Sequence, residues 1–325
     1  MQGYHKPHED ARSDKEDERK THVKSNFFAT RSGRIRICTQ KERHDYLAEQ
    51  CKQIPGHMRE GRNDVRLDRL LVDHEHKLIY CVIPKAACTT WKGLLANATS
   101  VGYTKRGTKI HWMYPHLVFS KTYLHKTGLD YMGQKDTKLW NTTFRHYKKF
   151  LVIRDPMQRI LSAYYDKLRD EKPLVPFLRL MKDYFNRTDI VPFSDFVHFL
   201  THPGYDGRYN IHWKTYDRLC SPCDIQYNYI LKVETMEHDQ NLILPLIGMS
   251  KKQSLPKLNI SPNSNSTDSH GKQDHFEDYW TLEESELKGL LDRYYIDRNV
   301  FGYQYDMQSR RSYCSIKTKE GDTCC

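Results

Sequence analysis

The sequence predicts an α/β fold with parallel strands, and two strand–turn–helix units support this prediction. Residues 78–83 form a continuous apolar run that ends at Pro84, and residues 150–153 form a second run that ends at 154–156 (Arg-Asp-Pro). Continuous apolar runs of this length are typical of strands buried on both faces. Two such units predict parallel strands in one sheet, and ligands bind such sheets at the carboxyl ends of the strands.

A helix is expected after each strand. Thr89 or Thr90 is expected to cap the first helix, which continues to Ala98, because a hydroxyl can accept a hydrogen bond from the free N–H groups of the first turn. The second helix has apolar residues on one face at helical spacing. They are Met157, Ile160, Leu161, Tyr164, Tyr165 and Leu168.

The remaining elements give weaker signals. In chain order they are a helix around 43–51, a helix over 193–200, a strand over 225–233, a polar loop over 251–274, and a helix that begins at a capping box of Thr281 and Glu284. Residues 1–24 carry six basic and six acidic residues and almost nothing apolar, so burial cannot offset the entropy they lose on ordering. We therefore expect a mobile, mixed-charge tail or stem over 1–61, a folded domain over 62–310 and a Cys-containing tail over 311–325.

The net charge of the chain points to an anionic ligand. The 325 residues include 52 Lys and Arg against 41 Asp and Glu, a formal net charge of +11. Residues 101–172 hold 15 Lys and Arg but only 6 Asp and Glu, a net of +9. This distribution favours a basic cleft for nucleic acid, a phosphorylated cofactor, an acidic glycan or a membrane surface. No apolar run approaches the about 18 residues that cross a bilayer, which excludes a multi-span membrane protein.

Cysteines and glycosylation motifs bear on the compartment. The chain has nine cysteines, so they cannot all pair within one chain. Five Asn-x-Ser/Thr acceptor motifs favour passage through the secretory pathway, although no signal-peptide pattern follows Met1. The acceptor residues are Asn97, Asn141, Asn186, Asn259 and Asn265.

The turn after the first strand has the residues to hold an oxyanion. Residues 84–92 read Pro-Lys-Ala-Ala-Cys-Thr-Thr-Trp-Lys, which brings a lysine and two hydroxyls to a helix N-terminus, where N–H groups and the helix dipole favour negative charge. The flanking glycines of a Walker A loop are missing, which argues against an ordinary NTPase. The alternative is a capped core helix with a solvated Lys85.

The turn after the second strand has a similar character. Arg154 follows the strand directly, and Ser162 lies eight residues later on the following helix. The guanidinium fork suits a phosphate group, and the hydroxyl can add a donor. The alternative is that Arg154 pairs with a carboxylate and that Ser162 is a packing residue.

These motifs resemble those of the Golgi carbohydrate sulfotransferases, in the group of the chondroitin and dermatan 4-O-, N-acetylgalactosamine (GalNAc) 4-O- and HNK-1 sulfotransferases. Residues 84–92 look like the family's 5′-phosphosulfate loop, and residues 154–167 look like its 3′-phosphate motif. Residues 212–235 and 301–303 are similar to two further family blocks. The resemblance spans about 78–305. The chain departs from the family pattern at Thr90, where Asn is usual, at Asp155, where His or Glu is common, and at Met157-Gln158.

The resemblance implies a P-loop-like sulfotransferase fold, with a central parallel sheet flanked by helices, over 62–310. It also implies 3′-phosphoadenosine 5′-phosphosulfate (PAPS) as the sulfate donor, with no metal required. Lys85 would stabilise the bridging oxygen of the leaving phosphate, and Arg154 and Ser162 would hold the 3′-phosphate. The expected donor-binding residues are those of the two motifs: Pro84, Lys85, Ala86, Ala87, Cys88, Thr89, Thr90, Arg154, Asp155, Pro156, Met157, Gln158, Arg159, Ile160, Leu161 and Ser162.

The catalytic base is expected to be a histidine, the usual base near neutral pH. His116 is preferred, because similar sequences carry a His before a short apolar run at this place, and His111 is the alternative. The pair Cys220 and Cys223 lacks the second pair that a zinc site needs, and the resemblance implies structural disulfides instead. Their partners, and the role of the adjacent Cys324 and Cys325, stay open.

The expected function is transfer of sulfate from PAPS to a glycan hydroxyl, foremost the GalNAc 4-OH of chondroitin/dermatan-type chains. The expected acceptor is an acidic glycan, either a glycosaminoglycan or a glycoprotein N- or O-glycan, and not nucleic acid. Two alternatives remain: another phosphonucleotide-using transferase or kinase, and a non-catalytic binder of acidic polymers. The resemblance implies a type II protein of the Golgi lumen or membrane. Because no membrane anchor is seen, we expect that the N-terminus is truncated and that membrane contact depends on that anchor.

Overall fold

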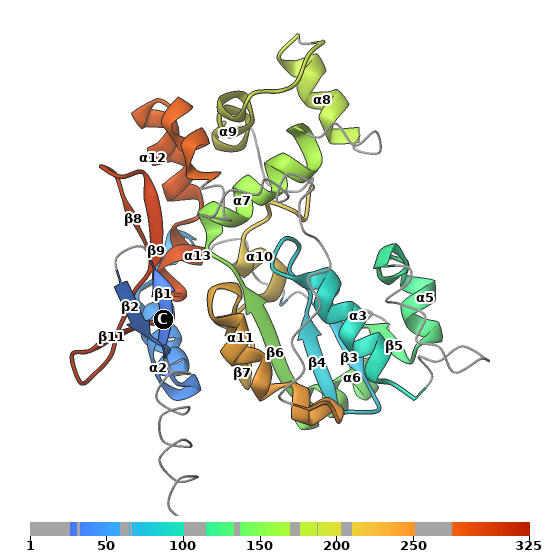
Figure 1. Cartoon of the computed structure of the whole chain (residues 1–325). Coiled ribbons are helices and arrows are strands. Elements are labelled where there is room, and N and C mark those ends of the chain that lie inside the picture. The colour runs from blue at the N-terminus through green and yellow to red at the C-terminus, as the bar shows by residue number, and fades with distance from the viewer. Residues whose placement is uncertain are drawn as a thin grey trace, which may run out of the picture.

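The computed structural model describes residues 27–30, 33–58, 65, 67–100, 115–132, 137–169, 176–186, 188–202, 210–250 and 275–325. Its centre is a five-stranded sheet with strand order β5-β3-β4-β6-β7 (Figure 1). The strands are β3 (Leu70–Asp73), β4 (Leu78–Cys81), β5 (Leu129–Tyr131), β6 (Lys148–Ile153) and β7 (Tyr229–Lys232).

The sheet is mixed. β4, β6 and β7 run parallel, as the two strand–turn–helix units predict, whereas β3 runs antiparallel to both β4 and β5. The α/β class is therefore confirmed, but the expectation of a parallel sheet is wrong at this edge. The reason is local: only residues 74–77 join β3 to β4, and a parallel pair needs a crossover of a dozen or more residues.

Both faces of the sheet are buried, because successive residues of β3, β4, β6 and β7 join different core clusters. Ile79 and Leu151 pack on one face with Leu47 of α2 (Gln40–Gln53) and Val300 of α13 (Tyr295–Val300). The other face is covered by α3 (Cys88–Ala98), whose buried tryptophan meets the Phe150 ring edge-on. This two-sided burial explains why the strands read as continuous apolar runs.

A third core cluster lies beyond the carboxyl ends of the strands. It joins α7 (Pro156–Tyr164), α9 (Phe193–Thr201), the 3₁₀ helix η8 (His275–Thr281) and α12 (Glu284–Arg293). In Figure 1, α7, α8 (Pro176–Tyr184), α9 and α12 occupy the upper part of the view, above the sheet. The helix α7 continues at Tyr165 into a single π-helical turn, η3 (Tyr165–Arg169).

The remaining helical elements are short, apart from α6. They are η1 (Gly56–Met58), η2 (Pro115–Phe119), α5 (Lys121–Lys126), α6 (Thr137–His146), α10 (Tyr216–Cys220), η4 (Val233–Thr235), α11 (Met236–Asp239), η5 (Gln240–Leu242) and η6 (Leu244–Ile247). The remaining strands are β1 (Phe27–Thr30), β2 (Gly33–Arg36), β8 (Tyr303–Asp306), β9 (Arg311–Cys314), β10 (Ile316–Lys317) and β11 (Thr323–Cys324). β1, β2, β11 and β10 form a small sheet, and β8 pairs with β9. None of the helices in the described ranges is long and apolar enough to cross a membrane.

Two predicted helix caps are wrong. Ala87, not Thr89 or Thr90, is the N-cap of α3, so both threonines lie inside the first turn. Thr281 ends η8 and its hydroxyl donates to the carbonyl of Asp278, so the capping box of α12 forms two residues later, from Glu283 and Glu286. The strand expected over 225–233 is confirmed only as β7, and the polar loop at 251–274 lies outside the described residues.

Four disulfides link segments that lie between 11 and 286 positions apart, which confirms structural disulfides. The pairs are Cys38–Cys324, Cys51–Cys223, Cys81–Cys220 and Cys314–Cys325, and Cys88 is a free thiol. Cys220 and Cys223 thus bond to different partners. The three-part division at residues 61 and 310 stays a prediction, but α2, which lies before residue 61, packs on the main core.

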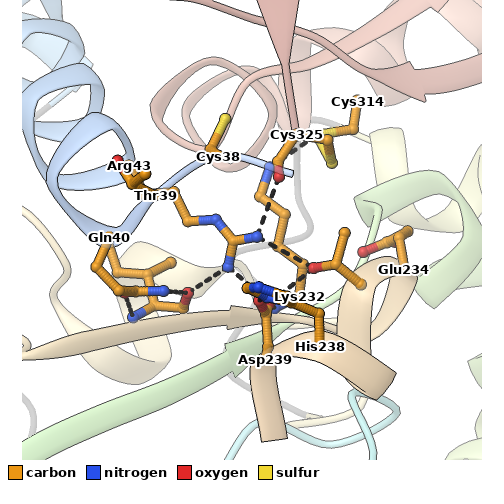
Figure 2. A network of polar contacts seen from close by, with 12 residues as sticks. Cys38, Thr39, Gln40, Arg43, Lys232, Glu234, His238, Asp239, Cys314 and Cys325 are labelled. Atoms are coloured by element: carbon orange, nitrogen blue, oxygen red, sulfur yellow. Dashed lines mark hydrogen bonds and ion pairs between the residues drawn. A yellow bond between two sulfur atoms is a disulfide. The ribbon is translucent and has the colours of Figure 1, made fainter. Parts of the chain in front are cut away.

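A buried polar network fixes α2 to the sheet (Figure 2). Arg43, which is 2% exposed, pairs with Asp239 at 2.6 Å. Its guanidinium also donates to the carbonyls of Ile230 and Cys325 and to the hydroxyl of Thr235. One side chain therefore joins α2, β7, α11 and the C-terminal segment.

Candidate functional site

The loop between β4 and α3 turns through an unusual backbone conformation. Lys85 and Ala87 have φ angles of 70° and 56°, in the left-handed region that non-glycine residues rarely adopt. Such strain costs about 1–3 kcal/mol per residue and is commonly found at ligand-binding sites. Helix α3 begins directly afterwards, and no side chain of the described residues caps it. A helix N-terminus without a side-chain cap is suited to an anion.

The turn between β6 and α7 lies beside that loop. Arg154 follows β6, and its Nη1 atom lies 3.5 Å from the carbonyl oxygen of Lys85. The backbone N–H of Arg154 donates to the hydroxyl of Tyr216, which donates in turn to the carbonyl of Arg154. The Nε atom of Arg154 is buried and has no hydrogen-bond partner in the described part of the chain. The two motifs that the sequence predicts are thus brought together at adjacent parallel strands.

Asp155 and Arg159 hold this turn in place. The Oδ1 atom of Asp155 caps α7 by accepting from the N–H groups of Met157 and Gln158 at 2.8 and 3.2 Å. Arg159 is fully buried and donates to the carbonyls of Pro84 and Lys214. Its remaining Nη1 atom has no partner among the described residues. A guanidinium with a buried free N–H group can still bind an anion.

A charged cluster lies next to the loop. The Oδ2 atom of Asp166 is 3.2 Å from the Nζ atom of Lys85 and 2.9 Å from that of Lys167. Burial lowers the pKa of Lys85, and the charge of Asp166 opposes that shift. Asp166 and Lys167 lie on the π-helical turn η3, and such turns are frequent at functional sites.

His212 belongs to this cluster, although the sequence did not single it out as a catalytic residue. Its Nδ1 atom lies 2.6 Å from the Oδ1 atom of Asn210. Burial, followed by the positive charges of Lys167 and Lys85, lowers the pKa of His212 to about 3. The only signal in the sequence is that His212 begins the segment 212–235, which is similar to a family block, 127 positions after Lys85.

The other predicted donor-binding residues differ in their exposure. Ala86, Met157, Ile160 and Leu161 are fully or almost fully buried, so their side chains hold the loop and α7 in place. Thr89 is buried in α3. Pro84 and Pro156 are also buried, whereas Cys88, Thr90, Gln158 and Ser162 are half-buried.

The two histidines predicted as the base cannot be placed at the site. His116 lies in η2, but its side chain is outside the described residues, and so is the whole of His111. Their roles therefore stay predictions. The 3₁₀ helix η2 packs on α3, since the carbonyl of Val118 accepts from the Nζ atom of Lys92 at 2.8 Å.

The predicted glycosylation acceptors also differ. Asn97 is 2% exposed within α3, so an attached glycan would have no room in the folded chain. Asn141 and Asn186 are exposed and stay predictions. Asn259 and Asn265 lie outside the described residues.

One group of side chains in the described ranges has metal-ligand spacing. It consists of Cys38, Glu42 and Cys324. The two cysteines form a disulfide with each other, so neither offers a thiolate to a metal.

Comparison with known proteins agrees with the resemblance seen in the sequence. The family model described as "Sulfotransferase family" matches residues 68–304. Carbohydrate sulfotransferase 9 from Homo sapiens is 28% identical over 281 residues, which cover 82% of this chain and 60% of that protein. Carbohydrate sulfotransferase 11 from Mus musculus is 30% identical, over 64% of this chain and 61% of that protein. Carbohydrate sulfotransferase 12 from Mus musculus is also 30% identical, over 73% of this chain and 60% of that protein. The chain thus spans about three fifths of the length of these relatives. No solved structure gives a significant match.

Proposed function

The chain belongs to the sulfotransferase family, and we propose that it transfers sulfate from PAPS to a hydroxyl of a carbohydrate. The observation that carries this proposal is the meeting of Lys85, Arg154 and Arg159 at the carboxyl ends of β4 and β6. The named relatives are carbohydrate sulfotransferases, which supports a glycan as the acceptor.

The site has the groups that a doubly phosphorylated donor requires. Arg154 and Arg159 each keep a buried N–H group without a protein partner in the described part of the chain. In our proposal Arg154 and Ser162 hold the 3′-phosphate, and the loop 84–90 holds the 5′-phosphosulfate. Because unpaired buried donors are rare in folded proteins, an anion that accepts from them fits the site well.

Lys85 is proposed to act on the leaving group. PAPS supplies an activated sulfuryl group whose transfer leaves negative charge on a phosphate oxygen. The ammonium group of Lys85 would neutralise this charge as it develops, which speeds the reaction because the interaction is stronger in the transition state than before it. Lys85 would then exchange its contact with Asp166 for one with the donor. We propose no metal in this scheme.

The acceptor that we propose is the 4-OH of GalNAc in chondroitin- or dermatan-type chains, within the broader class of acidic glycans. The excess of basic residues over 101–172 supports an anionic acceptor in addition to an anionic donor. We further propose that the protein acts in the Golgi lumen, bound to the membrane only through an anchor. Four disulfides support an oxidising compartment.

The test is a sulfate-transfer assay with labelled PAPS against desulfated chondroitin, dermatan and glycoprotein glycans, followed by disaccharide analysis. Lys85→Ala is expected to reduce transfer at least 10²-fold, because it removes the charge next to the leaving oxygen. Lys52→Ala removes an equal charge from an exposed position on α2 and is expected to leave transfer unchanged. A folded protein that sulfates no acceptor would refute the proposal. Salt-sensitive binding of acidic polymers that survives Lys85→Ala would then favour a non-catalytic binder.

A further inference from the structure

We propose that His212 accepts the proton of the attacking glycan hydroxyl, and that it does so only when the anionic donor is bound. This inference rests on the proposed function and names a catalytic residue for it. The supporting observations are the position of His212, the tautomer of its ring and the charges around it.

The position of His212 is fixed by contacts of its neighbours. Arg159 donates to the carbonyl of Pro84 at 3.1 Å and, through another nitrogen, to the carbonyl of Lys214. One guanidinium therefore holds the segment of His212 against the loop of Lys85. Trp213 is fully buried, and its carbonyl accepts from the hydroxyl of Tyr294, which anchors the same segment on α12's C-terminal end.

The contacts of Asn210 determine which ring nitrogen carries the proton. The Oδ1 atom of Asn210 accepts from the backbone N–H of His212 at 3.0 Å, and a backbone N–H can only donate. The same oxygen lies 2.6 Å from Nδ1 of the ring, so Nδ1 must be the protonated nitrogen. The lone pair of the neutral imidazole is therefore on Nε2, which leaves that atom able to accept a proton.

The charges around the ring are the part of its surroundings that a bound donor can offset. The charged groups that act on His212 are Lys85 on the β4–α3 loop, Asp166 and Lys167 on η3, and Arg159 on α7. Burial, followed by the positive charges of Lys167, Lys85 and Arg159, lowers the pKa of His212 to about 3, and the charge of Asp166 opposes that shift. The ring is then neutral but weakly basic. A donor that carries several negative charges and binds to Lys85 and Arg159 offsets their field. The pKa of His212 then rises toward its ordinary value, where a general base works best.

The proposed step is balanced in atoms and charge. The hydroxyl oxygen of the acceptor forms a bond to sulfur while its proton moves to Nε2 of His212. The bond between sulfur and the bridging phosphate oxygen breaks, and its electron pair stays on the phosphate next to Lys85. The products are the sulfate ester, 3′-phosphoadenosine 5′-phosphate and an imidazolium, which then releases its proton to solvent.

The first experiment measures the ring directly. The full chain with ¹³C,¹⁵N-labelled histidine is titrated by NMR with and without 3′-phosphoadenosine 5′-phosphate, which lacks the transferable group, and His212 is assigned from the signal lost in His212→Gln. Without the nucleotide, the ring is expected to be neutral and protonated on Nδ1 down to about pH 5; with it, the titration midpoint is expected to rise by at least one pH unit. A midpoint that does not move while the nucleotide binds, or a ring protonated on Nε2, would overturn the proposal.

The second experiment separates His212 from the other candidates. His212→Gln is expected to bind the nucleotide within about twofold of the unchanged protein and to lose transfer by 10²- to 10⁴-fold. His198→Gln, at an exposed position of α9, is the matched control and should keep full transfer. If His212→Gln keeps near-normal transfer while Lys85→Ala loses it, the role of His212 is refuted and the proposed function stands. If His116→Ala alone abolishes transfer, His116 is the base. If the unchanged protein transfers sulfate to none of the acceptors, the proposed function itself has failed.

Discussion

Asp155 is a buried carboxyl group at the start of α7, and three contacts hold it in place. One oxygen caps the helix, the other accepts from the hydroxyl of Ser312, and its backbone N–H donates to Glu234 at 2.7 Å. Burial, and then the nearby charge of Glu234, raise the pKa of Asp155 to about 6. The donor-binding role predicted for Asp155 stays a prediction. Its contacts with Glu234 and Ser312 could not be predicted from the sequence, because 79 and 157 positions separate these residues from it.

Because the pKa of Asp155 is raised, we expect the free energy of unfolding to depend on pH. An acid that binds its proton more tightly in the folded state stabilises the fold below its unfolded pKa, and this contribution is lost as pH rises through the folded value. Between pH 4 and pH 6 the unchanged protein should therefore lose about 2–3 kcal/mol from this group. Asp155→Asn keeps an oxygen to cap α7 and should remove this part of the slope. Urea unfolding of both proteins from pH 4 to pH 8 measures it; equal slopes would show that Asp155 does not titrate in this range.

At the scale of elements, the long apolar segments were the most predictable. β4, β6, α7, α9 and α2 were all expected, because burial on one or both faces leaves a repeating pattern in the sequence. The strands β8 to β11 were missed, because each is only partly buried and therefore lacks the continuous apolar run that marks β4 and β6. The π-helical turn η3 was missed because its residues continue the apolar pattern of α7. It carries Asp166 and Lys167, which end the 154–167 motif, but the contact of Asp166 with Lys85 could not be predicted before the fold was known.

The joint between α13 and β8 depends on Gly302. Its φ angle is 72°, and a Cβ atom there would lie 2.4 Å from the side chain of Ile316. Gly302→Ala is therefore expected to lower the free energy of unfolding by roughly 2–4 kcal/mol, from backbone strain and overlap together. Gly321→Ala is the matched control, because Gly321 also has a positive φ, but a Cβ atom there would have no described atom within 4 Å. We therefore expect this variant to lower the free energy of unfolding by only about 1 kcal/mol. Equal losses in chemical denaturation would show that Ile316 moves aside.

At the scale of the whole molecule, contacts between distant segments hold the fold together. Arg43 reaches Asp239, Ile230 and Cys325 (Figure 2). The four disulfides add covalent links between other distant segments, such as Cys38 with Cys324 and Cys81 with Cys220. The sequence showed that cysteines and charges were present but not how they pair. Pairing depends on which residues the finished fold brings together, and nine cysteines allow many arrangements.

Arg43 is expected to matter more for stability than other charged residues of its helix. Arg43→Met leaves the carboxylate of Asp239 buried without its counter-charge, which should lower the free energy of unfolding by about 3–5 kcal/mol. Lys41→Met breaks an exposed pair with Asp45 on the same helix and should change it by less than about 1 kcal/mol. Urea denaturation measures the free energy of unfolding of both variants. A small loss for Arg43→Met would mean that Thr235, His238 and the N–H of Lys232 suffice to hold Asp239.

The Cys38–Cys324 disulfide has a consequence for how the protein is made. Its two cysteines are 286 positions apart, so at 5–20 residues per second a ribosome needs about 15–60 s to pass from one to the other. During that time Cys38 is a thiol without its partner, while Cys51, Cys81 and Cys88 are already present. The native pairing therefore cannot be completed until Cys324 has left the ribosome. Biosynthesis has to take place where wrong disulfides can be exchanged, and this fold can become complete only after Cys324 has been synthesised.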